Sequence, residues 1–287
     1  MELVSIVIPA YNEEQAIGPV IEETIRAMDA AGRPYEIIVV DDGSRDGTAQ
    51  VVRGYPRVKL IQHHTNRGGG AARTTGIHAA QSEYVLVTDG DGSYPAQDTP
   101  RLFGALERCD MVVGARTREA GTVKLLRSFA KNAIRGLASL LTGRPIPDLN
   151  SGMRAFKKSL ALRYLHLLPP GHSWVSTITL AFMNDGLRVD FAPIDYYPRV
   201  GHSTFHPIKD TWKYLLTVLR TTIYFNPLRV YLPLAGLLMG VGALKALADL
   251  FIAGRANGAA VTWVVGGALA AGLGFLADLI VRRSKEP

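Results

Sequence analysis

The chain has 287 residues and a mass of 31.1 kDa, which is enough for one large domain or two smaller ones. A hydrophobic content of 47% excludes a disordered chain, and a single cysteine, Cys109, excludes an intramolecular disulfide framework and multi-cysteine metal sites. The net charge of +7 favours polyanionic partners such as nucleic acid, phosphorylated metabolites or anionic lipids. Because the N-terminus resembles a strand rather than a signal peptide, we expect the first domain to stay in the cytoplasm.

Short β-branched segments alternate with helical stretches over residues 1–206. The predicted strands are Val4–Ile8, Ile37–Val40, Val58–Ile61, Tyr84–Thr88 and Met111–Val113, and the predicted helices are Glu13–Ala31, Asp46–Gly54, Gly70–Gln81 and Thr99–Arg108. This alternation is typical of an α/β protein with a mostly parallel sheet that helices cover on both faces. Ligands of such sheets bind beyond the carboxyl ends of the strands.

Polar residues gather at three of these predicted strand ends. They follow in the order Pro9-Ala10-Tyr11-Asn12-Glu13, Asp41-Asp42-Gly43-Ser44 and Asp89-Gly90-Asp91-Gly92. Because the carboxyl ends of parallel strands meet at one edge, we expect the three clusters to form one site. Asp89 and Asp91 can both reach a divalent cation, although ordinary polar turns use the same residue types.

Residues 207–287 follow a different pattern. Apolar residues recur at helical spacing over residues 207–227 with basic residues between them, which favours an amphipathic helix in a membrane interface. Apolar segments follow at about 230–253 and 259–281, and the second is long enough by itself to cross a hydrocarbon core of ~30 Å. Lys245 and Asp249 interrupt the first segment, where we expect them to pair with each other or face the interface.

The basic residues also predict an orientation. Arg255 alone lies between the two apolar segments, whereas Lys and Arg residues flank their outer ends. This asymmetry predicts a two-helix transmembrane hairpin at 228–287 with a short basic tail and with both termini of the chain in the cytoplasm, in a multi-pass protein of the cell (inner) membrane. Because the basic residues follow the membrane boundaries, we expect no nucleic-acid partner. The alternative for the two segments is a buried helical pair in a soluble domain.

Several motifs in order resemble family 2 glycosyltransferases. They are Val7-Ile8-Pro9-Ala10-Tyr11-Asn12-Glu13-Glu14, Val39-Val40-Asp41-Asp42-Gly43-Ser44, Asn66-Arg67-Gly68-Gly69-Gly70-Ala71-Ala72-Arg73 and Asp89-Gly90-Asp91. Two later motifs are similar to the polyprenyl-phosphate branch of that family: Asp148-Leu149-Asn150-Ser151-Gly152-Met153-Arg154-Ala155-Phe156 and Tyr224-Phe225-Asn226-Pro227-Leu228-Arg229. The resemblance implies a GT-A type, Rossmann-like catalytic domain at residues 1–206. It also implies inverting transfer of a hexose from a nucleotide sugar (UDP-glucose or GDP-mannose type) to membrane polyprenyl phosphate.

The resemblance further implies roles for individual residues. Asp89 and Asp91 would hold Mg²⁺ or Mn²⁺ and would act in catalysis together with Asp148 and Arg199. The residues expected to contact the donor nucleotide are Pro9, Tyr11, Asn12, Glu13, Asp41, Asp42, Gly68, Gly70, Arg73, Asp89 and Gly90. Those expected to contact the acceptor phosphate are Arg116, Arg127, Lys131 and Ser151. The expected partners are therefore the nucleotide sugar, polyprenyl phosphate and the lipid bilayer, and related members imply a homo-oligomer.

Some positions depart from the family pattern, and other functions stay open. Ser93 stands where a glutamine is common, and Gly69 stands where many relatives carry a lysine. A processive polysaccharide synthase is disfavoured because the chain lacks a Gln-x-x-Arg-Trp motif. Dinucleotide binding is disfavoured because Arg73 occupies the place of the third glycine. A catalytically silent membrane adaptor or flippase subunit is the remaining alternative.

Overall fold

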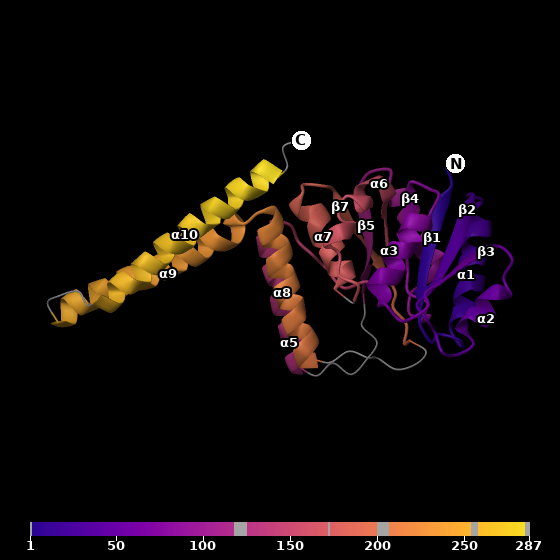
Figure 1. Ribbon diagram of the computed structural model, residues 1–287, viewed down its shortest axis with the longest axis horizontal. Helices are drawn as coiled ribbons and strands as arrows, with labels where there is room; N and C mark the ends of the chain where they lie inside the picture. The colour runs from indigo at the N-terminus through magenta and orange to yellow at the C-terminus, as the bar shows by residue number, and fades with distance from the viewer. Residues whose placement is uncertain (1, 118–124, 172, 200–206, 254–257, 285–287) are drawn as a thin grey trace. The chain divides into compact units, whose positions relative to one another are not determined.

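The computed structural model describes residues 2–117, 125–171, 173–199, 207–253 and 258–284. In this part of the chain the strands form one sheet in the order β3-β2-β1-β4-β6-β5-β7 (Figure 1). Their bounds are β1 Val4–Ala10, β2 Tyr35–Asp41, β3 Val58–Gln62, β4 Tyr84–Val87, β5 Met111–Arg116, β6 Arg154–Lys157 and β7 Val189–Ile194. All neighbouring strands are parallel except β6, which is antiparallel to β4 and β5. The predicted mostly parallel sheet is therefore confirmed.

Helices follow most of the strands. They are α1 Ile17–Ala31, α2 Thr48–Arg53, α3 Gly69–Ala79, α4 Thr99–Ala105, α5 Leu125–Thr142, α6 Lys158–Leu162 and α7 Trp174–Asn184, with 3₁₀ turns η1 Ala96–Asp98 and η2 Leu165–Leu167. The four helices predicted in this region are confirmed as α1 to α4, and each is somewhat shorter than the predicted range. Each of the five predicted strands is also present.

Side chains alternate between the two faces of the sheet, as the period of a strand requires. On one face, Ile6 and Ile8 of β1 pack with Ile17 of α1 in the main apolar core. On the other face, α3 lies so close to the sheet that a Cβ atom at Gly76 would be 2.2 Å from Val7 Cγ1. The sheet is thus covered on both faces, and only its edges and strand ends remain for ligands.

The C-terminal helices are α8 Pro207–Phe225, α9 Leu228–Ala253 and α10 Gly258–Ser284. By length and composition, α9 and α10 could each cross a membrane, with mean hydropathies of 1.7 and 2.1 in their most apolar windows. Only 11% and 17% of those windows are buried, whereas the core helix of a soluble domain would be mostly buried. The chain divides into two compact units, residues 1–140 with 144–217 and residues 141–143 with 218–287.

Helices α9 and α10 pack closely against each other through glycines. A Cβ atom at Gly242 of α9 would lie 2.7 Å from Val264 Cγ2, and one at Gly267 of α10 would lie 2.4 Å from Met239 Cγ. On α9 the ammonium group of Lys245 donates to Asp249 Oδ1 at 3.1 Å. The predicted pairing of these two residues is therefore confirmed.

Candidate active site

The loop after β1 is joined to the loop after β2 by backbone-to-side-chain hydrogen bonds. Asn12 has a φ of 55°, in the left-handed region that asparagine tolerates, and its side-chain oxygen accepts from the Arg45 N–H at 2.9 Å. Its own N–H donates to Ser44 Oγ at 2.9 Å, and the Glu13 N–H donates to Thr48 Oγ1 at 2.8 Å. The first two predicted polar clusters therefore lie side by side.

A pocket of about 280 Å³ opens beside these loops. It is lined by Tyr11, Asp41, Gly43, Ser44, Arg45, Gln62, His63, His64, Thr65 and Asn66. The Tyr11 side chain offers an exposed aromatic ring, whereas Asp41 is buried and accepts hydrogen bonds from the Ser44 N–H at 3.0 Å and from Gln62 Nε2 at 3.1 Å. The size of the pocket and its mixture of one aromatic ring with several polar groups suit a nucleoside.

Sequence reasoning identified Tyr11 and Asp41 in this pocket but missed the wall that follows β3. That wall consists of Gln62, which ends β3, and of His63, His64, Thr65 and Asn66 after it. A usable signal was present, because β3 is parallel to β2 and its polar C-terminal extension must reach the same edge of the sheet.

Asp42 faces the interior of the protein. Its Oδ1 accepts from the Arg67 N–H at 3.0 Å, its Oδ2 accepts from the Gly68 N–H at 2.7 Å, and Oδ1 also lies 2.7 Å from His63 Nδ1. The residue is only 1% exposed. Its carboxylate therefore anchors the glycine-rich loop.

The glycines of that loop have a packing role in this structure. Gly68 has a φ of 95°, and a Cβ atom there would lie 2.5 Å from the Pro170 carbonyl oxygen. The same oxygen accepts from the N–H groups of Gly70 at 2.7 Å and Ala71 at 3.1 Å. These amides at the start of α3 are therefore already bonded, and a direct contact between them and the donor would require Pro170 to move.

The acidic pair follows β4. Asp91 is 6% exposed, and its Oδ1 accepts from the Ser93 N–H at 3.1 Å and from Ser93 Oγ at 2.5 Å. Its other oxygen lies 3.7 Å from Arg199 Nε. Asp89 Oδ1 accepts from Arg73 Nη2 at 2.5 Å. Asp89, Asp91, Arg73 and Arg199 therefore lie close together in the structure. Ser93 orients Asp91 through its two hydrogen bonds.

Three carboxyl groups repel one another at this position. Burial raises the pKa of Glu13 to about 7, and the charges of Asp91 and Asp89 contribute to the rise. Burial also raises the pKa of Asp91, and the neighbouring charge of Asp89 adds to it. Pro9 and Gly90 form the adjoining wall, where a Cβ atom at Gly90 would lie 3.1 Å from the Pro9 carbonyl oxygen. This cluster of three carboxyl groups fits a cation site.

A divalent cation would find two hard oxygen ligands in Asp89 and Asp91, which suits Mg²⁺ or Mn²⁺. Among the described residues, no group of three His, Cys, Asp or Glu side chains could by itself hold a metal ion. The residues present therefore fit a cation that shares its coordination with phosphate oxygens of a ligand rather than one caged by protein alone.

The raised pKa of Glu13 predicts how the stability of the metal-free protein changes with pH. The pKa of Glu13 is about 7 in the folded protein and has its ordinary value of 4.5 in the unfolded chain, so the folded state binds the proton more tightly. The contribution of Glu13 to stability is therefore fully present below pH 4.5 and is lost as the pH rises to about 7. We expect the melting temperature of Glu13→Gln to fall less than that of the wild type over this interval. Glu23→Gln, at an exposed position on α1, is the matched control. Equal pH slopes in thermal denaturation would contradict the expectation.

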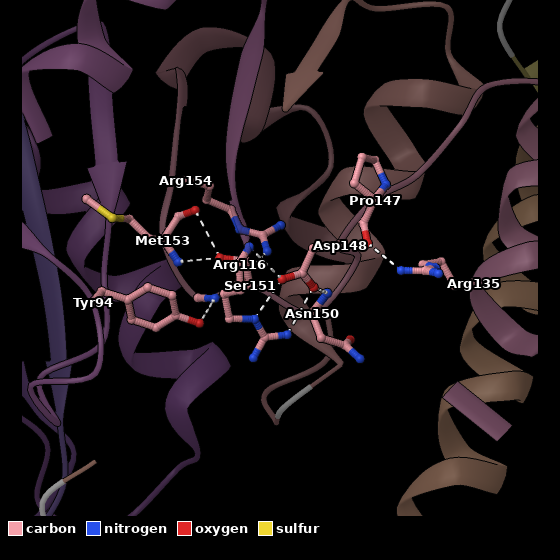
Figure 2. A network of polar contacts seen from close by, with 10 residues as sticks. Tyr94, Arg116, Arg135, Pro147, Asp148, Asn150, Ser151, Met153 and Arg154 are labelled. Carbon is pink, nitrogen blue, oxygen red and sulfur yellow. Dashed lines mark hydrogen bonds and ion pairs between the residues drawn. The ribbon is translucent and has the colours of Figure 1, made fainter. Parts of the chain in front are cut away.

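Asp148 and Arg116 face each other across the turn that precedes β6 (Figure 2). Arg116 Nε donates to Asp148 Oδ2 at 2.6 Å, and Arg116 Nη2 donates to Oδ1 at 3.0 Å. Burial alone would raise the pKa of Asp148, but the hydrogen bonds and charge of Arg116 outweigh it and hold the pKa below its ordinary value. The Arg116 guanidinium also lies over the Tyr196 ring, 5.1 Å from its centroid. Asp148 is therefore placed to orient Arg116 rather than to accept a proton.

The same turn packs directly against the acidic pair. The Gly152 N–H donates to the Tyr94 hydroxyl at 2.6 Å, and a Cβ atom at Gly152 would lie 2.2 Å from Asp89 Oδ2. Ser151 is fully buried, and its Oγ accepts from the Met153 N–H at 3.3 Å. In this structure Ser151 therefore shapes the turn and offers no exposed hydroxyl. Arg127 and Lys131 belong to α5, but their side chains lie outside the described part of the structure.

Residues 5–165 match the sequence family described as glycosyl transferase family 2. The match covers more than half of the chain and includes the motifs after β1, β2 and β4. The chain belongs to glycosyl transferase family 2.

Two relatives illustrate the branch. The chain is 26% identical over 298 residues to the dodecaprenyl-phosphate galacturonate synthase of Rhizobium johnstonii, with 97% of this chain and 87% of the relative covered. It is 32% identical over 171 residues to the undecaprenyl-phosphate 4-deoxy-4-formamido-L-arabinose transferase of Edwardsiella ictaluri, with 58% of this chain covered. That second match spans only 52% of the relative, or about half of its length.

Solved structures confirm the predicted GT-A type fold. The glucosyl-3-phosphoglycerate synthase of Mycobacterium tuberculosis, crystallised with Mn²⁺, UDP and phosphoglyceric acid, is similar with a TM-score of 0.61 and 20% identity, covering 77% of this chain and 78% of that one. The mannosyl-3-phosphoglycerate synthase of Rubrobacter xylanophilus gives a TM-score of 0.59 at 20% identity, covering 77% and 72%. At these identities the likeness concerns the fold alone.

Proposed function

We propose that the chain transfers a hexose from a nucleotide sugar to polyprenyl phosphate, with inversion at the anomeric carbon. The observation that carries the proposal is the Asp89–Asp91 pair after β4, in which Asp91 is buried and Asp89 is partly exposed, together with a nucleoside-sized pocket at the same edge of the sheet. The names of the relatives, which act on undecaprenyl and dodecaprenyl phosphate, support the class of acceptor.

One set of residues would bind the donor nucleotide sugar and its cation. Tyr11 and Asp41 would bind the nucleoside, and Asp89 and Asp91 would hold Mg²⁺ or Mn²⁺. When bound, such a cation neutralises the charge that develops on the departing diphosphate. Mn²⁺ and UDP in the similar mycobacterial structure support this choice of cofactor.

Arg116, oriented by Asp148, would bind the phosphate of the acceptor. That phosphate is already anionic at neutral pH, so the reaction needs no strong general base. The main task of the protein is then to hold two polyanions together, which fixed positive charges achieve by stabilisation and orientation. Arg127 and Lys131 would add to this positive charge, and Ser151 would act through the turn it stabilises.

We also propose that residues 228–287 anchor the enzyme in the cell membrane as a hairpin, with residues 207–227 in the interface and residues 1–206 in the cytoplasm. The apolar character of α9 and α10 supports this arrangement, as do the basic residues close to its outer ends, Arg229, Arg282 and Arg283. In this topology both termini are cytoplasmic. Assembly into a homo-oligomer stays a prediction.

A donor panel tests the proposed activity. The purified full chain in lipid nanodiscs would be incubated with Mn²⁺, polyprenyl phosphate and radiolabelled UDP- or GDP-hexoses. We expect label to enter the lipid fraction with one donor, with a β-linked product from an α-linked donor. Polyprenol without its phosphate is the matched control and should give no product. Folded protein that transfers no sugar from any donor would overturn the proposal.

A further inference from the structure

Each carboxylate of the acidic pair is capped by an arginine from a different part of the fold. Arg73, on α3, donates to Asp89 at 2.5 Å. Arg199, just after β7, lies 3.7 Å from Asp91 Oδ2. One oxygen of each carboxylate that would hold a divalent cation is therefore paired with a guanidinium group.

Only some of the hydrogen-bond donors of Arg73 have partners among the described residues. Its side chain is 10% exposed, yet its buried Nε has no hydrogen-bond partner among the described residues. Its guanidinium lies over the Trp174 ring at 5.9 Å from the centroid. In the described structure Asp89 supplies the ion pair that holds this buried cation, so loss of that pair leaves Arg73 in need of another anion.

A second buried cation, Arg154, makes Arg73 depend more strongly on its anionic partner. Arg154 of β6 is fully buried and donates to Ser151 O, Val175 O and Thr179 Oγ1, which are all uncharged acceptors. Burial lowers the pKa of Arg154 to about 10, and the nearby charge of Arg73 contributes to the decrease. The two guanidinium groups repel each other, and the negative charge of Asp89 offsets that repulsion.

Arg199 can leave Asp91 without disrupting the core. Its side chain is 42% exposed, and its second partner is Tyr196, to which it is hydrogen-bonded. Tyr196 in turn packs edge-on against Tyr94 with ring centroids 5.3 Å apart. The Arg199 side chain can therefore rotate while the two tyrosines stay packed.

We propose that Arg73 and Arg199 are exchangeable counter-cations: they neutralise Asp89 and Asp91 in the free enzyme, yield those carboxylates to the divalent cation, and then bind the phosphate groups of the substrate. This inference rests on the proposed function and deepens it, because it couples binding of the cation to binding of the phosphates. The cation alone competes with two arginines and binds weakly. With a nucleoside diphosphate present, the displaced arginines regain an anionic partner and both ligands bind more tightly.

Mn²⁺ titration of the full chain in detergent, followed by the electron paramagnetic resonance signal of free Mn²⁺, tests the exchange without turnover. We expect Arg73→Gln and Arg199→Gln each to lower the Kd for Mn²⁺ alone by about fivefold or more. UDP measured at saturating Mn²⁺ should bind less tightly to the same variants. Arg101→Gln is the matched control and should change neither Kd, because the Arg101 side chain is 51% exposed and pairs with Asp98 at 3.0 Å.

The opposite signs of the two effects separate exchange from a structural role. If Kd for Mn²⁺ alone is unchanged or raised in both variants, or if neither wild type nor variants bind Mn²⁺, the proposal is overturned. Should Arg73→Gln fail to fold, the exposed Arg199→Gln decides the outcome by itself. Sugar transfer by the wild type is measured separately. An active wild type whose variants show no change in Kd refutes the exchange only, and an inactive wild type refutes the proposed function.

Discussion

Replacing Asp91 with asparagine is expected to lower kcat for sugar transfer by roughly 10²–10³-fold or more, because the change removes a charged oxygen ligand from the acidic pair. The same change is expected to keep or raise the melting temperature of the metal-free protein. Burial and the charge of Asp89 raise the pKa of Asp91, so its ionised form already opposes folding. Steady-state kinetics and thermal denaturation of one preparation measure both effects.

A matched control uses the same substitution where the carboxylate has no such neighbours. Asp190 of β7 has a 44% exposed side chain and lies 3.8 Å from Arg188, so Asp190→Asn should leave both kcat and melting temperature close to the wild-type values. Wild-type turnover by Asp91→Asn would contradict the metal-binding role. Loss of activity together with unfolding would instead indicate that Asp91 is needed for the fold.

Gly152→Ala is expected to lower kcat by ~10²-fold with little loss of folded protein, because small misplacements of catalytic groups carry penalties of this size. The added methyl carbon would lie 2.2 Å from Asp89 Oδ2, so the carboxylate has to turn away from it. A carboxylate is the end of a side chain that can rotate, and for this reason the displacement falls on the site more than on the core.

Gly104→Ala controls for the loss of a glycine, since no atom lies within 4 Å of a Cβ atom at that position of α4. This control should keep wild-type kinetics. Circular dichroism confirms that both variants are folded. Full activity in Gly152→Ala would mean that Asp89 does not need its present placement, and the proposed role of the turn would be wrong.

The sequence predicted those parts of the fold whose signals are local. The strand β1 and the polar residues after it, such as Tyr11, form a continuous pattern that identifies both the element and its functional end. Asp42 could not be assigned in the same way, because its partners Arg67 and Gly68 are far along the chain. The structure shows Asp42 buried and bonded to the glycine-rich loop, and its contact with a nucleotide stays a prediction.

Strand β6 shows why the remaining parts of the fold could not be predicted from the sequence. Its four residues, Arg154–Lys157, include two cations and present no alternating pattern, yet the strand lies between β4 and β5. The buried guanidinium of Arg154 is held by three uncharged oxygens, one from nearby Ser151 and two from Val175 and Thr179 of α7. Such a position is decided by tertiary contacts, which override the local preference of arginine for water.

The antiparallel insertion of β6 also constrains the order of events during synthesis. Val87 of β4 pairs with Arg154, so one edge of β4 has no neighbour until the ribosome has made the residues of β6. Pairings between segments so far apart in sequence are slow to form, and an open strand edge invites association with other chains. The nascent chain is therefore open to aggregation over this interval, and the turn at Gly152 that contacts Asp89 also forms only after β4 has waited for this later segment.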